Sequence, residues 1–458
     1  MRTRAAAPSR SDVGALRRAL GVAGYDEKRL RGALALRGRF VAPSAGRHGL
    51  YLQRVGEHGA LSTLTRLFLL ETPVPGERAA EALAPLGLDG AEALGLVRTE
   101  GASVVPLVRI APHDGLFIVS DSGDWDGADK PEDFVPGLSG AGVTVANLTP
   151  RVQVADALDL GAGSGLHALL AARNADRVVA TDINARALEF ADLNAQLNGF
   201  ANLELRKGDL FAPVAGERFD LIVANPPFVV GPDRRYVFRD GGPGFVERVL
   251  RGAPDHLRDS GVAVVSVGWA HDGRDTWAEP RGWLDGSGCD AVVLRIADLD
   301  PLSNGWSFTR DGEASARWAD ALRAEGVRAI AYGAIVLRRR PGGGRIAAVD
   351  LAGKDVPSAG AHVSRILDNL EWLDANEERL ASVGFEAADG LELRVVEQLG
   401  AATDAPRPAR LALRRGLPVV VEAGDALVAA VRRGTVGGDA ALAPDIRRLF
   451  ENGLLTPT

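Results

Sequence analysis

The first 120 residues space their apolar positions as helices do. The pattern predicts helical segments at Val13 to Leu20, Glu27 to Leu36, Leu61 to Leu70, Glu77 to Leu83 and Ala91 to Val97. Two strand-like runs follow, Val104 to Ile110 and Leu116 to Ser120, with the turn Pro112-His113-Asp114-Gly115 between them. Short helices followed by a hairpin are typical of a winged helix, which binds nucleic acid or packs against an enzyme. We therefore expect a helical, winged-helix-like N-terminal domain over residues 1–120.

Strand and helix patterns alternate through the middle of the chain. The predicted strands are Ala157–Leu160, Val178–Thr181, Leu203–Arg206, Leu221–Ala224, Val262–Val267, Ala291–Ile296 and Ala331–Leu337. The predicted helices are Leu166–Arg173, Ala185–Leu197, Phe245–Leu257 and Ala314–Glu325. This alternation indicates a doubly wound α/β domain with seven strands, whose ligands bind at the carboxyl ends of the strands. We expect it over residues 121–345, with Asp121 to Gly142 as a linker or flap and Pro341-Gly342-Gly343-Gly344 as its end.

The last section, residues 346–458, predicts a small α+β region. A polar amphipathic helix is expected around Arg365 to Leu380, and a second helix over Ala440 to Leu455. Strand-like runs lie between them at Leu391–Val396 and Val419–Glu422. No catalytic signature is present there, so we expect an accessory domain that binds substrate or acts as a scaffold.

Composition narrows the class of protein. At 458 residues, with 46% hydrophobic and 25% charged residues, the chain fits a protein of two or three globular domains. Its longest apolar runs, such as Ala263-Val264-Val265, have the length of strands, and no apolar segment follows the basic N-terminus. Cys289 is the sole cysteine, which excludes an internal disulfide and a cysteine-built metal site. We expect a cytoplasmic protein that neither enters a membrane nor binds a metal.

The charge is uneven along the chain. The net charge is −7, yet residues 1–60 hold twelve Lys/Arg against four Asp/Glu. A basic segment on an acidic body can bind polyanions. It can also be a solvated helical surface, which the helical interleaving of Arg17, Arg18 and Arg29 with Leu16, Leu20 and Leu30 favours.

A glycine-rich loop follows the first strand of the α/β section. Its sequence is Asp159-Leu160-Gly161-Ala162-Gly163-Ser164-Gly165, and a helix is predicted from Leu166. Glycines let the backbone approach a ligand without Cβ clashes, and a helix N-terminus is positive. The spacing is Gly-x-Gly-x-Gly, whereas dinucleotide-binding loops have Gly-x-Gly-x-x-Gly, so a pyrophosphate ligand is disfavoured.

Carboxylates at the next two strand ends complete a nucleoside site. Asp182 ends the second strand about twenty residues on, where a carboxylate binds both ribose hydroxyls. Asp209 ends the third, where it can accept a hydrogen bond from an adenine amino group. Their neighbours Ile183 and Leu210, with Ala162 of the loop, are predicted to contact the same ligand.

Asn225-Pro226-Pro227-Phe228 follows the fourth strand. A planar amide or aryl amine is a poor nucleophile, because its lone pair is delocalised. The Asn225 side-chain carbonyl and the Pro226 backbone carbonyl can accept both of its N–H bonds and direct the lone pair at a methyl group. Pro227 stiffens the loop, and Phe228 offers a face for stacking. The two motifs together predict methyl transfer from S-adenosylmethionine, with Asn225 close to cofactor and acceptor alike.

Residues 148–268 resemble the HemK-type glutamine N5-methyltransferases of the class I methyltransferase superfamily, which also holds N6-adenine-type enzymes. The matching segments are Leu148-Thr149-Pro150-Arg151, the glycine loop, Asn194-Ala195, Asn198-Gly199, Gly208-Asp209-Leu210-Phe211, Asn225-Pro226-Pro227-Phe228 and Arg239-Asp240-Gly241-Gly242. The resemblance implies a Rossmann-like seven-stranded methyltransferase domain, S-adenosylmethionine as cofactor and a protein glutamine as acceptor. It also places Thr149 and Arg151 near the substrate. The HemK group usually has tyrosine where Phe228 stands, and phenylalanine there is similar to rRNA guanine-N2 and adenine-N6 enzymes.

Three functions therefore compete. The first is methylation of a protein glutamine, and the second is methylation of a nucleobase amine in rRNA, tRNA or DNA. The third is a nicotinamide oxidoreductase or an inactive Rossmann-type binding module, against which the glycine spacing and the Asn225 loop argue. Trp269, Trp277, Trp283 and Trp306 lie beside the expected substrate entrance. They can stack on a base or an aromatic peptide or can pack in the core, and we place Trp269 among the substrate contacts.

Overall fold

The computed structural model describes residues 9–36, 47–123, 131–231, 244–380, 382–394, 409–434, 436 and 440–458. The chain divides into two compact units. Among the described residues, unit 1 comprises those within 1–143 and 154–215, and unit 2 comprises those within 144–153 and 216–458.

The N-terminal part of unit 1 is mainly helical, as predicted. Its helices are α1 (Arg10–Val22), α2 (Glu27–Leu34), α3 (His48–Val55), α4 (Ala60–Leu64), which continues as a π-helical turn over Thr65–Leu69, α5 (Gly76–Ala82) and α6 (Gly87–Ala93). A three-stranded sheet of β1 (Val74–Pro75), β3 (Ser103–Pro106) and β2 (Val97–Glu100) accompanies them in that order. From α4 to β3, the elements follow one another as in a winged helix.

The predicted hairpin is wrong in its first strand. The run from Val104 to Ile110 is divided between β3 and β4 (Val108–His113), and β4 pairs with β5 (Leu116–Asp121). The chain changes partner at Pro106, which has no N–H to donate, and at Leu107, whose N–H donates to the Leu96 carbonyl. The hairpin that belongs to the winged-helix-like part is β2–β3, and β4–β5 is a second hairpin.

Two asparagines attach the β4–β5 hairpin to helix α9 (Ala185–Asn198). The Asn194 amide accepts from the Val119 N–H and donates to the Val119 carbonyl, each at 2.8 Å. The Asn198 amide makes the same two bonds with Phe117, at 2.9 and 2.8 Å. One hydrophobic core contains buried side chains from Val13 of α1 through to Leu197 of α9. Unit 1 therefore continues past residue 120, and the two asparagines of the family motif serve its architecture.

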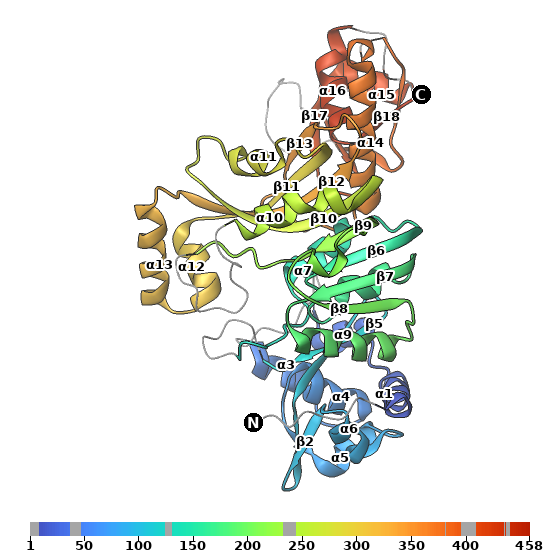
Figure 1. Cartoon of the computed structure of the whole chain (residues 1–458), viewed down its shortest axis with the longest axis vertical. Coiled ribbons are helices and arrows are strands. Elements are labelled where there is room, and N and C mark those ends of the chain that lie inside the picture. Colours follow the sequence, from blue (N-terminus) through green and yellow to red (C-terminus); the bar gives the residue numbers. More distant parts are fainter. Residues whose placement is uncertain are drawn as a thin grey trace, which may run out of the picture. The chain divides into compact units, whose positions relative to one another are not determined.

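The predicted strands of the α/β section all form. Unit 1 holds the parallel strands β6 (Val154–Leu160), β7 (Ala175–Asp182) and β8 (Leu203–Lys207), with helices α8 (Leu166–Ala171) and α9. Unit 2 holds β9 (Phe219–Ala224), β10 (Leu257–His271), β11 (Cys289–Leu299), β12 (Ala329–Arg339) and β13 (Ile346–Asp350) (Figure 1). The strand order is β13-β11-β12-β10-β9-β6-β7-β8, with β12 antiparallel to both of its neighbours. This is the Rossmann-like mixed sheet that the sequence predicts.

The sheet has eight strands where seven were predicted. The glycines after Pro341 make a turn, in which the Gly343 N–H donates to the Arg340 carbonyl. After that turn, β13 pairs in parallel with β11. The glycine-rich segment was interpreted as the end of the domain because glycines mark turns and linkers alike.

Four helices of unit 2 accompany its strands. They are α10 (Phe245–Gly252), α11 (Ala278–Leu284), α12 (Pro301–Thr309) and α13 (Gly312–Ala324). The sequence predicted α10 and α13 but neither α11 nor α12. Helix α7 (Gly140–Leu148) precedes the sheet.

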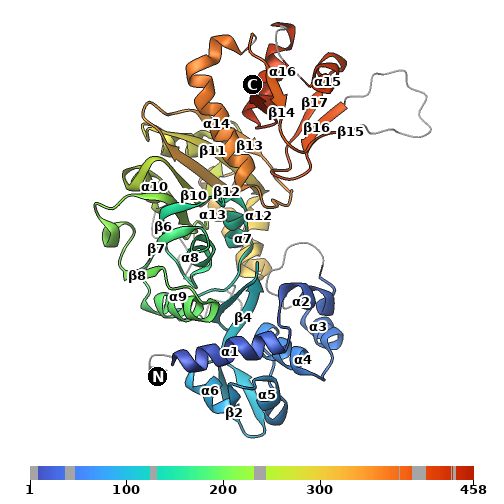
Figure 2. The ribbon, with the colours of Figure 1, turned by 90° about the vertical axis from the view of Figure 1, so that its right-hand side faces the viewer.

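The C-terminal section has the small α+β content that was predicted (Figure 2). Its elements are α14 (Gly360–Asn376), β14 (Phe385–Ala387), β15 (Leu391–Arg394), β16 (Ala409–Leu413), β17 (Val420–Ala423), α15 (Asp425–Arg432), α16 (Ala443–Glu451) and β18 (Leu455–Pro457). Trp372, Phe385 and Phe450 pack against one another, with ring centroids 5.1 to 5.6 Å apart. Among the residues whose positions are described, no helix has both the length and the apolar character needed to cross a membrane.

A buried histidine should make the C-terminal section sensitive to acid. His362 accepts from the Leu417 N–H through Nδ1 at 3.0 Å, and its Nε2 lies 2.8 Å from the Asn452 carbonyl, to which it donates. Burial lowers the pKa of His362 to about 4, against the opposing hydrogen bond with Asn452. A histidine in an unfolded chain titrates near 6.5, so the folded state loses up to about 3 kcal/mol of stability as the pH falls from about 6.5 to 4.

Hydrogen exchange would measure this loss on peptides that contain Leu417. We expect their protection, corrected for the intrinsic exchange rate, to fall between pH 6.5 and 4 in the parent protein. His362→Gln, whose amide does not titrate, should show a flatter profile. Equal pH profiles in the two proteins would show that His362 does not carry the effect.

Candidate active site

The glycine loop joins β6 to α8 and takes a left-handed backbone at each glycine. The φ angles are 75° at Gly161, 53° at Gly163 and 84° at Gly165. A Cβ added at Gly161 or Gly163 would meet no atom within 4 Å, whereas one at Gly165 would lie 3.1 Å from Cα of Ala191 in α9. Gly165 therefore allows two helices to pack closely, while the first two glycines leave open space beside the loop.

Asp182, at the end of β7, holds the glycine loop. Its carboxylate accepts from the Gly163 N–H at 2.9 Å and from the Asn184 N–H at 2.8 Å. Burial raises the pKa of Asp182, against the hydrogen bonds from these backbone N–H groups. Each carboxylate oxygen has two lone pairs, so acceptor capacity remains for a ligand hydroxyl.

The loops after β7 and β8 meet at Asp182. The Gly208 N–H donates to the Asp182 carbonyl at 3.0 Å. Ile183 is 66% exposed, an unusual position for a large apolar side chain. Asp209 is exposed, and Leu210 has a φ of 45°. Within unit 1, the structure therefore brings together the glycine loop, Asp182 and the start of the loop that carries Asp209.

Asp159 lies beneath the glycine loop. It is buried, and its Oδ2 accepts from the Ala168 N–H of α8 at 2.8 Å. Burial raises the pKa of Asp159 to about 7 despite that hydrogen bond, and the charge of Asp182 adds to the rise. Its other oxygen, Oδ1, has no hydrogen-bond donor in the part of the chain that the structure describes.

The acceptor loop, residues 225–231, belongs to unit 2 and follows β9. The Ser266 hydroxyl of β10 donates to Oδ1 of Asn225 at 2.6 Å. This bond orients the Asn225 amide, whose oxygen is the predicted acceptor for the substrate nitrogen. Gly268 leaves room for the loop, because a Cβ there would lie 2.4 Å from the Phe228 carbonyl oxygen. The sequence interpretation missed Ser266, although Val265 pairs with Ala224 and places the next residue of β10 beside Asn225.

A second contact fixes the far end of the acceptor loop. Phe228 meets Tyr332 of β12 edge to face, with ring centroids 5.8 Å apart. The Tyr332 hydroxyl donates to Oδ1 of Asn304 at 2.6 Å, and Nδ2 of Asn304 donates to the Val230 carbonyl at 3.0 Å. Asn304 lies on α12, so sequence reasoning that lacked α12 had no means to find it.

Comparison with known proteins agrees with this geometry. The family described as Methyltransferase small domain matches residues 139–271. A release factor glutamine methyltransferase of Xylella fastidiosa is 38% identical over 157 residues, which cover 31% of this chain and 55% of that protein. A ribosomal protein uL3 glutamine methyltransferase of Bradyrhizobium diazoefficiens is 37% identical over 164 residues, with 31% and 50% covered. Residues 139–271 thus match a methyltransferase domain, and the relatives that match this region are glutamine methyltransferases.

The matching region is only part of this chain. The match also spans only about half the length of these curated relatives. Residues 4–107 match a Domain of unknown function (DUF7059). The methyltransferase match agrees with the expectation drawn from the glycine spacing, and it disfavours a nicotinamide oxidoreductase.

Thr149 and Arg151 of the methyltransferase domain lie in unit 2, at the end of α7. The Thr149 hydroxyl donates to the Val145 carbonyl at 2.8 Å, and Arg151 is exposed. A Cβ at Gly360, the first residue of α14, would lie 2.4 Å from the Thr149 carbonyl oxygen. The Thr149 backbone therefore packs against α14, and the proposed substrate contact at these two residues remains a prediction.

The prediction that Trp269 contacts substrate is wrong in this structure. Trp269 is 1% exposed, and its Nε1 donates to the Thr276 carbonyl at 2.7 Å, so it packs inside the methyltransferase domain. Trp283 is also buried. Trp277 is partly buried against Trp269, and Trp306 on α12 is 50% exposed.

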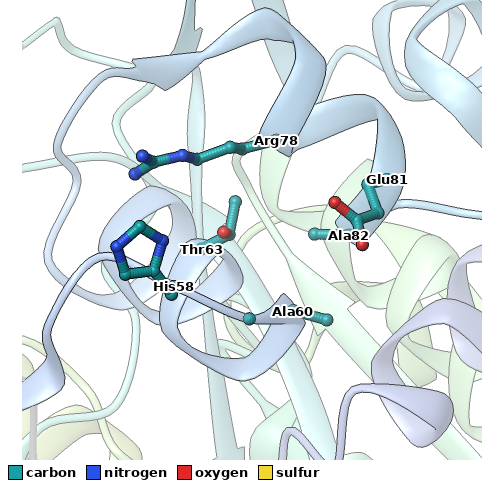
Figure 3. Close-up of a pocket in the computed structure, with 7 residues that line it drawn as sticks. His58, Ala60, Thr63, Arg78, Glu81 and Ala82 are labelled. Atoms are coloured by element: carbon teal, nitrogen blue, oxygen red, sulfur yellow. The ribbon is translucent and has the colours of Figure 1, made fainter.

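Other candidate features lie outside the methyltransferase domain. A pocket in the winged-helix-like part is lined by His58, Gly59, Ala60, Thr63, Arg78, Glu81 and Ala82, with His58 and Arg78 opposite Glu81 (Figure 3). It contains none of the predicted site residues. In the basic N-terminal segment, Arg29 pairs with Asp26 and Arg31 with Glu27, each at 3.5 Å, which favours a solvated surface.

Two predictions concern residues or groups beyond these sites. The Arg239-Asp240-Gly241-Gly242 motif lies outside the described residues. Within the ranges that are described, no three His, Cys, Asp or Glu side chains gather as a metal site would require.

Proposed function

We propose that this protein uses S-adenosylmethionine to methylate the side-chain amide nitrogen of a glutamine in a protein. The observation that carries the proposal is the acceptor loop, in which Ser266 fixes the amide of Asn225. Two relatives are named as glutamine methyltransferases of a release factor and of ribosomal protein uL3, and these names support a protein glutamine as the acceptor. Such targets work in the cytoplasm, where we therefore place the activity.

The residues of unit 1 fit the proposed cofactor. The open space at Gly161 and Gly163 admits a ligand against the loop backbone. Asp182 would accept hydrogen bonds from the ribose hydroxyls, and the exposed Ile183 would cover one face of the adenine. Oδ1 of Asp159 is an acceptor that fits the amino group of the methionine portion. When bound, S-adenosylmethionine supplies an electrophilic methyl group on a sulfonium sulfur.

The acceptor loop would prepare the glutamine nitrogen. Oδ1 of Asn225 keeps a lone pair beyond the one used by Ser266, and the Pro226 carbonyl is a second acceptor. Two accepted N–H bonds would hold the amide with its lone pair directed at the methyl group. The methylated nitrogen then loses one proton to solvent, so no general base is needed. Positioning and electrostatics supply the rate.

A nucleobase amine is the second candidate acceptor. Phe228 in place of tyrosine and the basic segment over residues 1–60 favour it. Against it stand the ion pairs that occupy Arg29 and Arg31.

One experiment separates the two acceptors. The protein is incubated with methyl-labelled S-adenosylmethionine and a ribosome-containing bacterial extract, and samples are then treated with RNase or protease. We expect label that protease releases and RNase does not, with mass spectrometry locating the methyl group on a glutamine. Label that RNase releases would replace the protein acceptor by a nucleobase.

Substitution at Phe228 tests the stacking face. Its edge contact with Tyr332 shows that the ring is held from one side. Phe228→Tyr keeps the ring and should retain substantial activity. Phe228→Ala should lose roughly 1–3 kcal/mol of stacking free energy, which would appear as a lower kcat/KM. Steady-state kinetics with the acceptor protein that the labelling experiment identifies would measure kcat/KM for both variants. Equal kcat/KM in the three proteins would rule out a substrate role for Phe228.

A further inference from the structure

Helix α12 presents an apolar ridge to solvent. Leu302 and Trp306, four residues apart on the same helix face, are 45% and 50% exposed. Large apolar side chains in adjacent exposed positions are typical of interaction surfaces, and an exposed tryptophan is a frequent anchor of protein interfaces. The ridge is therefore a candidate contact surface.

The other sides of α12 are occupied within unit 2. Asn304 is fully buried and holds Val230 and Tyr332, as described above. Gly305 packs against α13, because a Cβ there would lie 3.0 Å from the Ser315 carbonyl oxygen. Figure 1 shows α12 and α13 side by side beyond the ends of β11 and β12. Burial of these sides leaves the Leu302–Trp306 ridge as the apolar face that α12 offers to a partner.

Aromatic contacts tie this helix pair to the acceptor loop. Phe308 of α12 stacks on Trp318 of α13, with ring centroids 5.8 Å apart, and meets Tyr332 at 6.5 Å. Tyr332 in turn meets Phe228. A Cβ at Gly231 would lie 2.1 Å from the Trp318 ring, so the loop backbone packs on α13. The acceptor loop and the α12–α13 pair therefore form one continuous packed structure.

The charge of the helix pair indicates the class of partner. Residues 300–325 hold five acidic side chains, Asp300, Asp311, Glu313, Asp320 and Glu325, against Arg310, Arg317 and Arg323. A net negative surface repels the phosphates of nucleic acid and suits a neutral or basic protein segment. An apolar ridge also fits an apolar side chain of such a segment better than it fits a ribose-phosphate backbone.

We propose that the Leu302–Trp306 ridge is the docking surface for the protein segment that carries the target glutamine. This inference rests on the proposed function and goes beyond it, because it assigns substrate recognition to α12. Asn304 faces the opposite side of α12 from Leu302 and Trp306 and holds that side against the acceptor loop, so a protein docked on the ridge would be kept in a fixed position relative to Asn225.

Kinetics with a purified bacterial release factor, and in parallel with purified ribosomal protein uL3, test the surface. We expect Leu302→Ala combined with Trp306→Ala to raise KM for the methylated protein about tenfold or more, as loss of an interface anchor does. The kcat and the calorimetric affinity for S-adenosylmethionine should change by less than about twofold, because neither side chain touches the acceptor loop in the proposed arrangement. Leu50→Ala is the matched control, because Leu50 on α3 is 44% exposed.

The outcomes separate the two proposals. Parental KM in the double variant, with a protein that the parent methylates, would overturn the docking surface and leave the glutamine methyltransferase standing. A raised KM in Leu50→Ala as well would also overturn it, since the effect would then be general. If the parent protein methylates RNA and neither of the two proteins, the proposed function is wrong, and the docking surface for a protein substrate is wrong as well.

Discussion

Asn225→Ala should lower turnover by on the order of a hundredfold or more, the usual loss when one positioned polar group is removed from an active site. In the proposed mechanism the side chain supplies an oxygen to the substrate nitrogen, and Ser266 holds that oxygen in place at 2.6 Å. The cofactor residues of unit 1 are untouched, so affinity for S-adenosylmethionine should stay within about twofold. Single-turnover kinetics would measure the chemical step, and calorimetry would measure cofactor binding.

Ser266→Ala is the graded control for this result. It keeps the Asn225 oxygen but removes the hydroxyl that orients it, so turnover should fall less than in Asn225→Ala. The loss of one hydrogen bond to a neutral partner corresponds to about 1 kcal/mol, or roughly fivefold. Parental turnover in Asn225→Ala would contradict the acceptor-loop mechanism itself.

The sequence allowed the sheet to be predicted strand by strand, because buried strands leave a strong local signal. Val264, Val265, Ile335 and Val336 are all fully buried, and each lies in a run of apolar residues. The strand ends followed from the same runs, and with them the places of Gly161, Asp182 and Asn225. The prediction failed where local pattern and tertiary pairing differ. The strand pattern continues through Pro106, yet the pairing of β3 ends there; the glycines near Gly343 indicate a domain boundary, yet they make a turn within the sheet.

The parts of the candidate site that were missed depend on pairing between distant segments. Ser266 is an ordinary strand residue until its register beside Ala224 is known. Asn304 lies 74 positions from Val230, and nothing near it in the sequence indicates that contact. Trp269 and Trp306 also show that the sequence alone does not determine which side chains are buried. Their closeness in the sequence made both of them candidates for substrate contact, and only their burial in the structure distinguishes the packed Trp269 from the exposed Trp306.

Asp182→Ala should weaken binding of S-adenosylmethionine at least tenfold. The variant would lose the charge-assisted hydrogen bonds that we propose between Asp182 and two ribose hydroxyls, each of which would contribute roughly 1.5–3 kcal/mol. It also leaves the Gly163 N–H without the acceptor that now lies 2.9 Å away, so the glycine loop becomes less well held. Titration calorimetry at neutral pH would give the affinity of the parent and of the variant.

Two further measurements make this last prediction specific. Asp209→Ala removes an exposed carboxylate from the neighbouring loop and should cost less affinity than Asp182→Ala. Burial raises the pKa of Asp182, so the carboxylate becomes protonated in milder acid than an exposed aspartate does. The affinity of the parent should therefore fall as the pH is lowered, whereas the affinity of Asp182→Ala should depend less on pH. Unchanged affinity in Asp182→Ala, or tight binding of NAD by the parent, would refute the assignment of this site to S-adenosylmethionine.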